Sequence, residues 1–137
     1  MQHRFPYSWL PPLKIPDDNL IGIFEAGLEK PSSPPSEIIR RSLRHPIGAP
    51  PLVEAARGKT NALILCDDNT RYTPAHLVLP HVIETLNRAG VPNGNIRILI
   101  AAGTHRDLTR AERIAKMGES VVTKHAVEYH RCSDPNE

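Results

Sequence analysis

Two short polar stretches carry the residue types that could do chemistry. Residues 67–71 read DDNTR, and residues 103–106 read GTHR. Imidazole is the usual general acid or base near neutral pH, and a guanidinium can hold a carboxylate or phosphate at two points. The two stretches therefore predict a site that binds an anion beside a group that transfers protons.

His105 is the candidate acid or base, and Arg71 is the candidate anion ligand. A helix is expected to begin shortly after Arg71, and the positive end of a helix is a poor place for a second cation unless an anion lies between them. Simpler interpretations stay open, because Asp67 or Asp68 could only cap that helix, and Gly103 could only form a turn. The candidate binding residues are Asp68, Asn69, Thr70, Arg71, Gly103, Thr104 and Arg106, with Asp67 and His130 as possible further members.

Each polar stretch follows an apolar run. ALILC (62–66) and IRILIAA (96–102) show little alternation, which is typical of strands covered on both faces. Between them, the apolar spacing predicts a helix over 75–89, kinked or split at Pro80. A third strand is expected within 126–130 and would end at His130.

A second helix is predicted after the GTHR stretch. Thr109 and Glu112 form a T-x-x-E capping box, and the helix should run to about Met117 and close at Gly118. The order strand, helix, strand, helix, strand predicts a Rossmann-like βαβαβ fold, with a parallel sheet and helices on both faces. Ligands bind outside the carboxyl ends of such strands, so the polar stretches and His130 should converge at one edge.

Residues 1–35 differ from the rest in composition, because they are rich in proline. We expect an irregular segment with one strand at 20–26 (LIGIFEA), followed by an α/β domain over 36–137. Ser36 is the expected N-cap of a helix that ends near His45, and a short helix is expected over 52–57.

Composition excludes several classes of protein. The chain has 137 residues, a net charge of +2 and two cysteines. The charge is too small and too dispersed for nucleic-acid binding, no apolar stretch is long enough to span a membrane, and the N-terminus lacks the apolar core of a secretory signal. These features predict a cytoplasmic protein. No metal site is expected within the chain, because Cys132 and His130 alone do not make one.

At these motifs the sequence resembles the N-terminal domain of the nickel-dependent lactate racemase family. The resemblance rests on EIIRRSLRHPIGAPPL, on DDNTR followed by TP, on LNRAGVPNGNIRILIAAGTHR and on LTRAE, and it runs from about Ser36 onward. Tyr72 is a departure, because many members have proline directly after the arginine.

The resemblance implies a cofactor and a mechanism. Family members bind a nickel pincer nucleotide and racemise or epimerise a 2-hydroxy acid by hydride transfer, while histidines on opposite faces handle the hydroxyl proton. By motif position His105 would be one of these bases, and Asp68 and Arg71 would hold the cofactor or the substrate carboxylate.

The resemblance also implies that the chain is one part of an enzyme. Family members are about three times longer, and the attaching lysine, the nickel-binding histidine and the second base lie further along them. The chain is therefore expected to need a C-terminal domain and to be inactive alone. The alternative is a truncated, non-catalytic α/β module that binds an anion or nucleotide. Hydrolase chemistry is disfavoured, because no G-x-S-x-G occurs.

Overall fold

The computed structural model describes residues 2–3, 9–24, 27, 30–130 and 132. The chain forms two units, residues 1–31 and 32–137. In the first unit, β1 (Gln2–His3) pairs antiparallel with β2 (Leu13–Lys14), and the 3-10 turn η1 spans Asp17–Asn19.

The prediction of a strand at 20–26 is wrong for residues 20–24, which do not form a strand. Residues 25 and 26 lie outside the described part. Ile21 and Phe24 are almost fully exposed there, so no packed face supports a strand.

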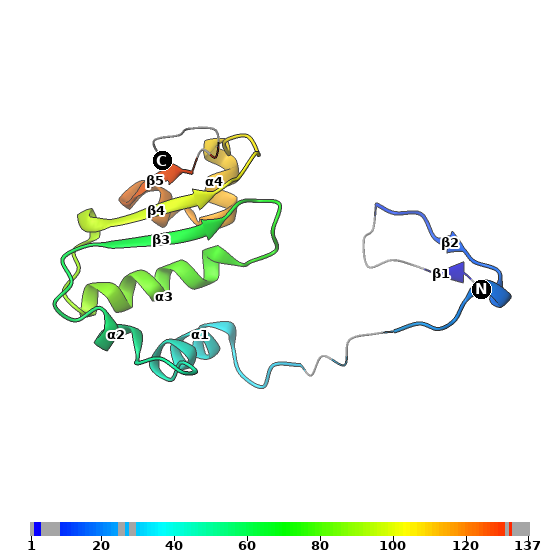
Figure 1. The fold of residues 1–137 in the computed structure, drawn as a ribbon, viewed down its shortest axis with the longest axis horizontal. Coiled ribbons are helices and arrows are strands. Elements are labelled where there is room, and N and C mark those ends of the chain that lie inside the picture. The colour runs from blue at the N-terminus through cyan, green and yellow to red at the C-terminus, as the bar shows by residue number, and fades with distance from the viewer. Residues whose placement is uncertain (1, 4–8, 25–26, 28–29, 131, 133–137) are drawn as a thin grey trace. The chain divides into compact units, whose positions relative to one another are not determined.

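The second unit is built on a parallel sheet. Its strands are β3 (Ala62–Asp67), β4 (Ile96–Ala101) and β5 (Ala126–Tyr129), in the order β3-β4-β5 (Figure 1). The register pairs Asp67 with Ala101 and Ile100 with Tyr129, so the carboxyl ends of the strands lie at one edge. The predicted parallel α/β architecture is confirmed.

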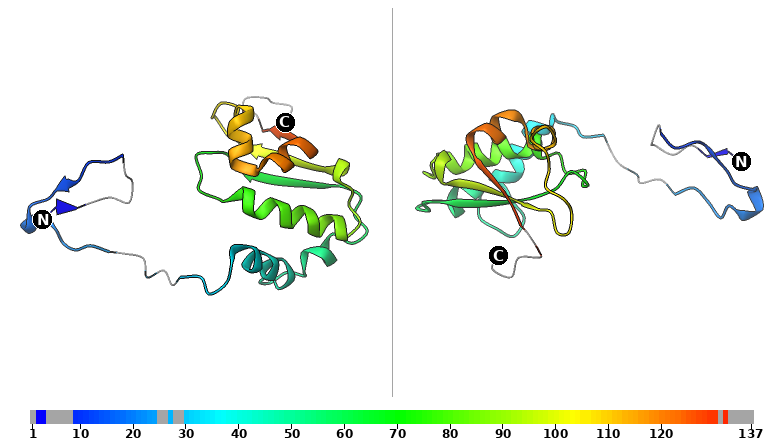
Figure 2. Two further views of the ribbon diagram at one scale, coloured as in Figure 1. Left: turned by 180° about the vertical axis from the view of Figure 1, so that it is seen from behind. Right: turned by 90° about the horizontal axis from the view of Figure 1, so that it is seen from above.

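Five helices accompany the strands among the described residues. They are α1 (Pro35–Arg44), α2 (Leu52–Ala55), α3 (Ala75–Arg88), α4 (Arg110–Met117) and α5 (Glu119–Lys124), and the 3-10 turn η2 (Asn93–Asn95) precedes β4. Figure 2 shows α3, α4 and α5 on the same side of the strands.

Side-chain burial confirms that the sheet is covered on one face. Ile98 and Ile100 of β4 are fully buried, whereas Leu63 and Leu65 of β3 are 55% and 69% exposed. The expectation of cover on both faces is therefore met on only one within the described residues. The strand order explains this, because right-handed crossovers that advance in one direction across a sheet place their helices on the same face.

The buried face forms the core with the helices. Its largest fully buried side chains are Ile96, Ile98, Ile100, Met117 and Val91. From α3 come Leu79, Ile83 and Leu86, and from α5 comes Val121. Cys66 is also buried, as expected for the end of an apolar strand.

Three details of the helices differ from the predictions. The N-cap of α1 is Pro34 rather than Ser36, because Pro35 occupies the first helical position, where its fixed φ fits and no N–H is needed. Pro80 does not split α3, since only one backbone hydrogen bond is lost and the buried face of the helix keeps it in place. Helix α5 was not predicted. It has only six residues, and its two apolar side chains, Val121 and Val122, are adjacent and so do not show the apolar spacing of a helix.

Candidate functional site

The two polar stretches leave neighbouring strands at the same edge of the sheet. Residues 67–71 follow from β3 and residues 103–106 from β4, whose ends are aligned in register. Gly103 has a φ of +61°, a left-handed conformation that favours glycine, and it lets the chain turn directly after the strand. A Cβ at Gly103 would meet nothing within 4 Å, so the backbone angle alone accounts for the residue.

Asp68 and His105 form the central contact of the site. The Asp68 Oδ2 atom lies 2.5 Å from His105 Nδ1. Asp68 is only 3% exposed, while the His105 side chain is half exposed. A buried carboxylate thus holds one nitrogen of an imidazole whose other side faces outward, although the two residues are 37 positions apart in sequence.

Asp68 is ionised at neutral pH. Hydrogen bonds from the Thr70 side chain and from His105, together with the Thr70 backbone N–H, lower its pKa to about 2, against an ordinary 3.8. The Thr70 hydroxyl lies 2.6 Å and the Thr70 nitrogen 3.1 Å from Asp68 Oδ1. Because the carboxylate can only accept, we assign the His105 proton to Nδ1, which leaves the Nε2 lone pair free to take a proton.

Asp67 turns away to a different partner. Its Oδ1 lies 2.8 Å from the ammonium of Lys116 on α4, and its Oδ2 accepts from the Thr73 hydroxyl at 2.5 Å. Partial burial raises the pKa of the Asp67 carboxyl, but the hydrogen bonds from Lys116 and Thr73 outweigh this and leave the pKa below its ordinary value. Asp67 therefore braces the loop rather than lining the site.

Arg106 is held by helix α4. Its terminal nitrogens lie 2.8 and 2.6 Å from the two carboxylate oxygens of Glu112, and Asn69 Nδ2 lies 3.5 Å from the same carboxylate. Glu112 also completes the predicted capping box with Thr109, which the structure confirms. The guanidinium of Arg106 is therefore engaged within the chain, as is the amide of Asn69.

Arg71 differs from Arg106. Its side chain is exposed, and no hydrogen bond or ion pair joins its guanidinium to the described residues. Its backbone is fixed, because the Arg71 nitrogen donates to Asp68 O at 3.3 Å and its carbonyl accepts from Lys116 at 2.9 Å. The structure thus offers an exposed cationic side chain on a fixed backbone, three residues after Asp68. Thr104 is exposed on the other loop.

The third strand supports the second loop. The Tyr129 hydroxyl accepts from Leu108 N at 3.1 Å and donates to Leu108 O at 3.0 Å. His130 follows β5 at the same edge, and its nitrogen donates to Ile100 O at 3.0 Å, but no described contact joins its side chain to His105. His130 thus lies at the predicted edge without being part of the Asp68–His105 contact.

Sequence reasoning missed the residues that support the site. Lys116 and Tyr129 lie within a predicted helix and a predicted strand and belong to no motif. For Lys116 one signal was available, namely its spacing from Glu112. It falls four residues after Glu112 and so lies on the same face of the helix.

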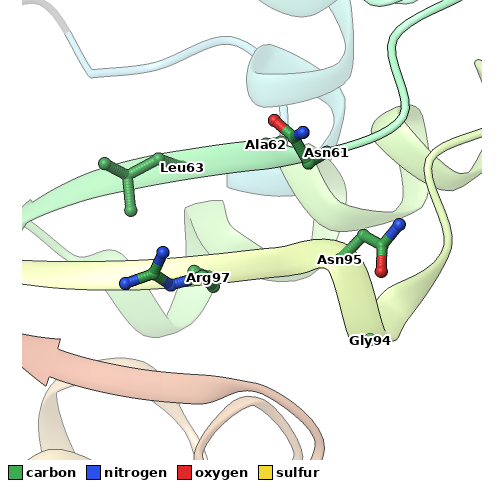
Figure 3. Close-up of a pocket in the computed structure, with 6 residues that line it drawn as sticks. All are labelled: Asn61, Ala62, Leu63, Gly94, Asn95 and Arg97. Carbon is green, nitrogen blue, oxygen red and sulfur yellow. The ribbon is translucent and has the colours of Figure 1, made fainter.

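A hollow of about 450 Å³ lies at the opposite edge of the sheet (Figure 3). It is lined by Asn61, Ala62, Leu63, Gly94, Asn95 and Arg97. Two of its polar side chains are already paired, because Asn95 Nδ2 donates to Thr60 O at 2.7 Å and Arg97 pairs with Glu128. It lies at the amino ends of β3 and β4, away from the Asp68–His105 contact.

The described residues contain neither a metal cluster nor a membrane-spanning helix. They hold no group of three or more His, Cys, Asp or Glu side chains that could bind a metal ion. None of their helices is long and apolar enough to cross a membrane.

Comparison with known proteins identifies relatives. Residues 10–137 match the family model of the lactate racemase N-terminal domain, so the match begins earlier than the predicted boundary at residue 36. A lactate racemase of Lactiplantibacillus plantarum is 36% identical over 123 residues, which are 88% of this chain and 29% of that protein. A lactate racemase of Thermoanaerobacterium thermosaccharolyticum is 36% identical over 110 residues, 79% of this chain and 26% of that protein.

A solved structure supports the same relationship. The lactate racemase apoprotein of Thermoanaerobacterium thermosaccharolyticum superposes with a TM-score of 0.72 at 31% identity, and the match covers 88% of this chain and 28% of that one. The chain therefore spans between a quarter and a third of the length of the relatives that it matches.

Proposed function

The chain belongs to the lactate racemase N-terminal domain family, and on that premise we propose that it supplies one proton-transferring wall of an enzyme that racemises or epimerises a small 2-hydroxy acid. The observation that carries this proposal is the contact between Asp68 and His105. Most of the length of its relatives lies outside the matched region, so the second wall of the site would come from a C-terminal domain.

The Asp68–His105 pair suits a group that must take and return a proton. Asp68 fixes the ring and stabilises the imidazolium that forms when Nε2 accepts a proton. In the proposed reaction His105 Nε2 takes the proton of the 2-hydroxyl group as the carbonyl forms, and gives it back when the hydroxyl reforms. The orientation of the ring would be set before substrate binds, which reduces the rearrangement needed for the transfer.

Arg71 is the proposed ligand for a carboxylate or phosphate. Its guanidinium has no partner among the described residues, its backbone is fixed, and a planar fork suits two-point contact with either anion. This chemistry suits a carboxylate of the substrate and a phosphate of the cofactor equally. Arg106 and Asn69 would act indirectly, since Glu112 already engages both.

The resemblance implies a nickel pincer nucleotide, which when bound would accept the hydride from the 2-carbon and return it. Because the described residues hold no metal-binding cluster, we propose that the nickel and the covalent attachment are provided by the C-terminal domain. The residues of this chain would support that cofactor without binding its nickel. Arg71 would bind a phosphate or carboxylate, and His105 would move a proton.

Replacement of His105 tests the proposal. In the complete gene product loaded with its cofactor, His105→Ala should lower kcat for lactate racemisation by about 10² to 10⁴-fold, the usual contribution of a general acid or base. His125→Ala is the matched control, because His125 lies at the end of α5 and should leave the rate within twofold. A His105→Ala protein that keeps more than about a third of the wild-type rate would remove His105 from this role.

A non-catalytic anion-binding module is the alternative, and Arg71 favours it, because no described residue pairs with its guanidinium. Such a protein would bind sulfate or phosphate through Arg71 yet show no racemisation of lactate or other 2-hydroxy acids at any cofactor loading. Calorimetric titration with phosphate, compared between wild type and Arg71→Ala, measures the first property, and the racemisation assay measures the second.

A further inference from the structure

Lys116 is a buried cation whose three donors are all used. It is 8% exposed, and its ammonium lies 2.8 Å from Asp67 Oδ1, 2.9 Å from Arg71 O and 3.1 Å from Thr73 O. An ammonium has three N–H groups, so these partners account for every one of them. All three partners lie within residues 67–73, which are the last residue of β3 and the loop that follows it.

A buried charge is a costly way to fill this position. An apolar side chain of similar length would pack beneath the loop without giving up hydration, whereas an ammonium must be matched by well-placed acceptors. Here the acceptors are one carboxylate and two backbone carbonyls, all from residues 67–73. The contact therefore specifies the path of the loop rather than simply filling space.

Non-covalent contacts join the two ends of the loop, Asp67 and Thr73. The Thr73 hydroxyl donates to Asp67 Oδ2, and Lys116 bridges the Asp67 carboxylate and the Thr73 carbonyl. Asp68 and Arg71 lie between Asp67 and Thr73 in the sequence, so the backbone that carries them is held at both ends. The carbonyl of Arg71 is itself one of the three acceptors.

Glu112 makes the matching contact to the second loop. It lies four residues before Lys116, and therefore on the same face of α4, where it binds Arg106 and contacts Asn69. One helix face thus holds the loop that carries Asp68 and the loop that carries His105, which sets the separation between them.

From these contacts we infer that Lys116 is a positioning residue for the proton-transfer site: it holds the loop that presents Asp68 to His105 and that carries Arg71. This inference rests on the proposed function only for its effect on the reaction. Its effect on the loop can be measured whether or not the protein is a racemase.

Lys116→Met in the complete gene product tests the inference, because methionine keeps the length and removes the ammonium. The amides of Thr70 and Arg71, which donate to Asp68, should exchange with deuterium at least tenfold faster than in wild type, while those of β4 stay unchanged. The KM for the 2-hydroxy acid should rise at least fivefold, because the backbone of Arg71 is released. Lys124→Met, at an exposed lysine of α5, is the matched control and should change neither value.

Asp67→Asn is the milder second variant in case Lys116→Met folds poorly. It keeps the shape of the side chain and the two carbonyl acceptors of Lys116, so it should raise loop exchange in the same direction by a smaller factor. A loss of folded protein alone would lower the apparent kcat and leave KM unchanged, so a changed KM separates positioning from general damage.

The outcomes distinguish the two proposals. If Thr70 and Arg71 exchange at wild-type rates in Lys116→Met and KM stays within twofold, the positioning role is overturned. If exchange accelerates as expected but the wild-type protein racemises no 2-hydroxy acid, the loop contact stands and the proposed function fails.

Discussion

Two adjacent aspartates have different roles in this structure. Asp68 is buried and holds His105, whereas Asp67 binds Lys116 and Thr73. Successive residues at a strand end point to opposite sides, so neighbours of identical type reach different partners. The sequence ranked Asp68 as a candidate binding residue and Asp67 as a possible further one, and the contacts show that Asp68 lies beside the imidazole while Asp67 braces the loop.

The depressed pKa of Asp68 predicts a dependence of stability on pH. Because its folded-state pKa of about 2 lies below the ordinary 3.8, the ionised carboxylate favours folding above about pH 4, and this contribution is lost as the pH falls through 2. The difference in unfolding free energy between wild type and Asp68→Asn should therefore shrink steadily from pH 5 to pH 2. Urea denaturation at several pH values measures it, and parallel curves for the two proteins would contradict the depressed pKa.

Helix α4 links the two loops, and its first turn is fixed by a capping box. Thr109 Oγ1 accepts from Glu112 N at 3.3 Å, while the Glu112 carboxylate accepts from Thr109 N at 2.8 Å and also binds Arg106. One glutamate therefore both starts the helix and holds the GTHR loop. Its pKa is lowered to about 2, chiefly by Arg106 and then by Thr109.

Loss of the cap should weaken the fold modestly. Thr109→Ala removes the acceptor for Glu112 N, and replacing such an N-cap costs about 0.5 to 2 kcal/mol of unfolding free energy. Thr123→Ala is the control, since its hydroxyl bonds within α5 to a carbonyl that is already part of the helix; its cost should stay under about 0.5 kcal/mol. Equal losses in urea denaturation would show that the capping box adds no stability of its own.

At the scale of residues 32–137, the unit is built on a three-stranded sheet that has one buried and one exposed face among the described residues. The exposed face combines Leu63 and Leu65 with the paired Arg97 and Glu128. Since β3, β4 and β5 follow one another across the sheet, the helices between them lie together on the other face. Cover for both faces would require a strand order that reverses direction, as in a complete doubly wound sheet.

This difference between the faces predicts unequal effects of two substitutions in adjacent strands. Ile98→Ala removes a fully buried side chain and should cost about 2 to 5 kcal/mol of unfolding free energy. Leu65→Ala, at a side chain that is 69% exposed, should cost less than about 1 kcal/mol. Urea denaturation of the 137-residue chain gives both values. A large loss at Leu65 would mean that its face is covered in the folded chain.

The sequence by itself determined the elements whose local signals are strong. The apolar runs predicted β3 and β4, and the T-x-x-E pattern predicted the start of α4. A turn at Gly103 was one of the interpretations that the sequence left open, and the structure shows it. The same reasoning selected Asp68 and His105 as members of one site, because the carboxyl ends of parallel strands meet at one edge. The elements and the contact between Asp68 and His105 could be predicted because each depends on residues that are close in sequence or on a general rule of topology, whereas the role of the two residues in a site stays a prediction.

Tertiary structure decided the remaining features. Which aspartate reaches the imidazole depends on a contact between residues 37 positions apart, and the path of the loop after β3 depends on Lys116, which binds Arg71 O from 45 positions away. Burial of only one sheet face depends on strand order, which the apolar runs do not encode. The predicted strand at 20–26 was wrong over residues 20–24 for a related reason: an alternating segment becomes a strand only where a neighbouring strand can pair with it.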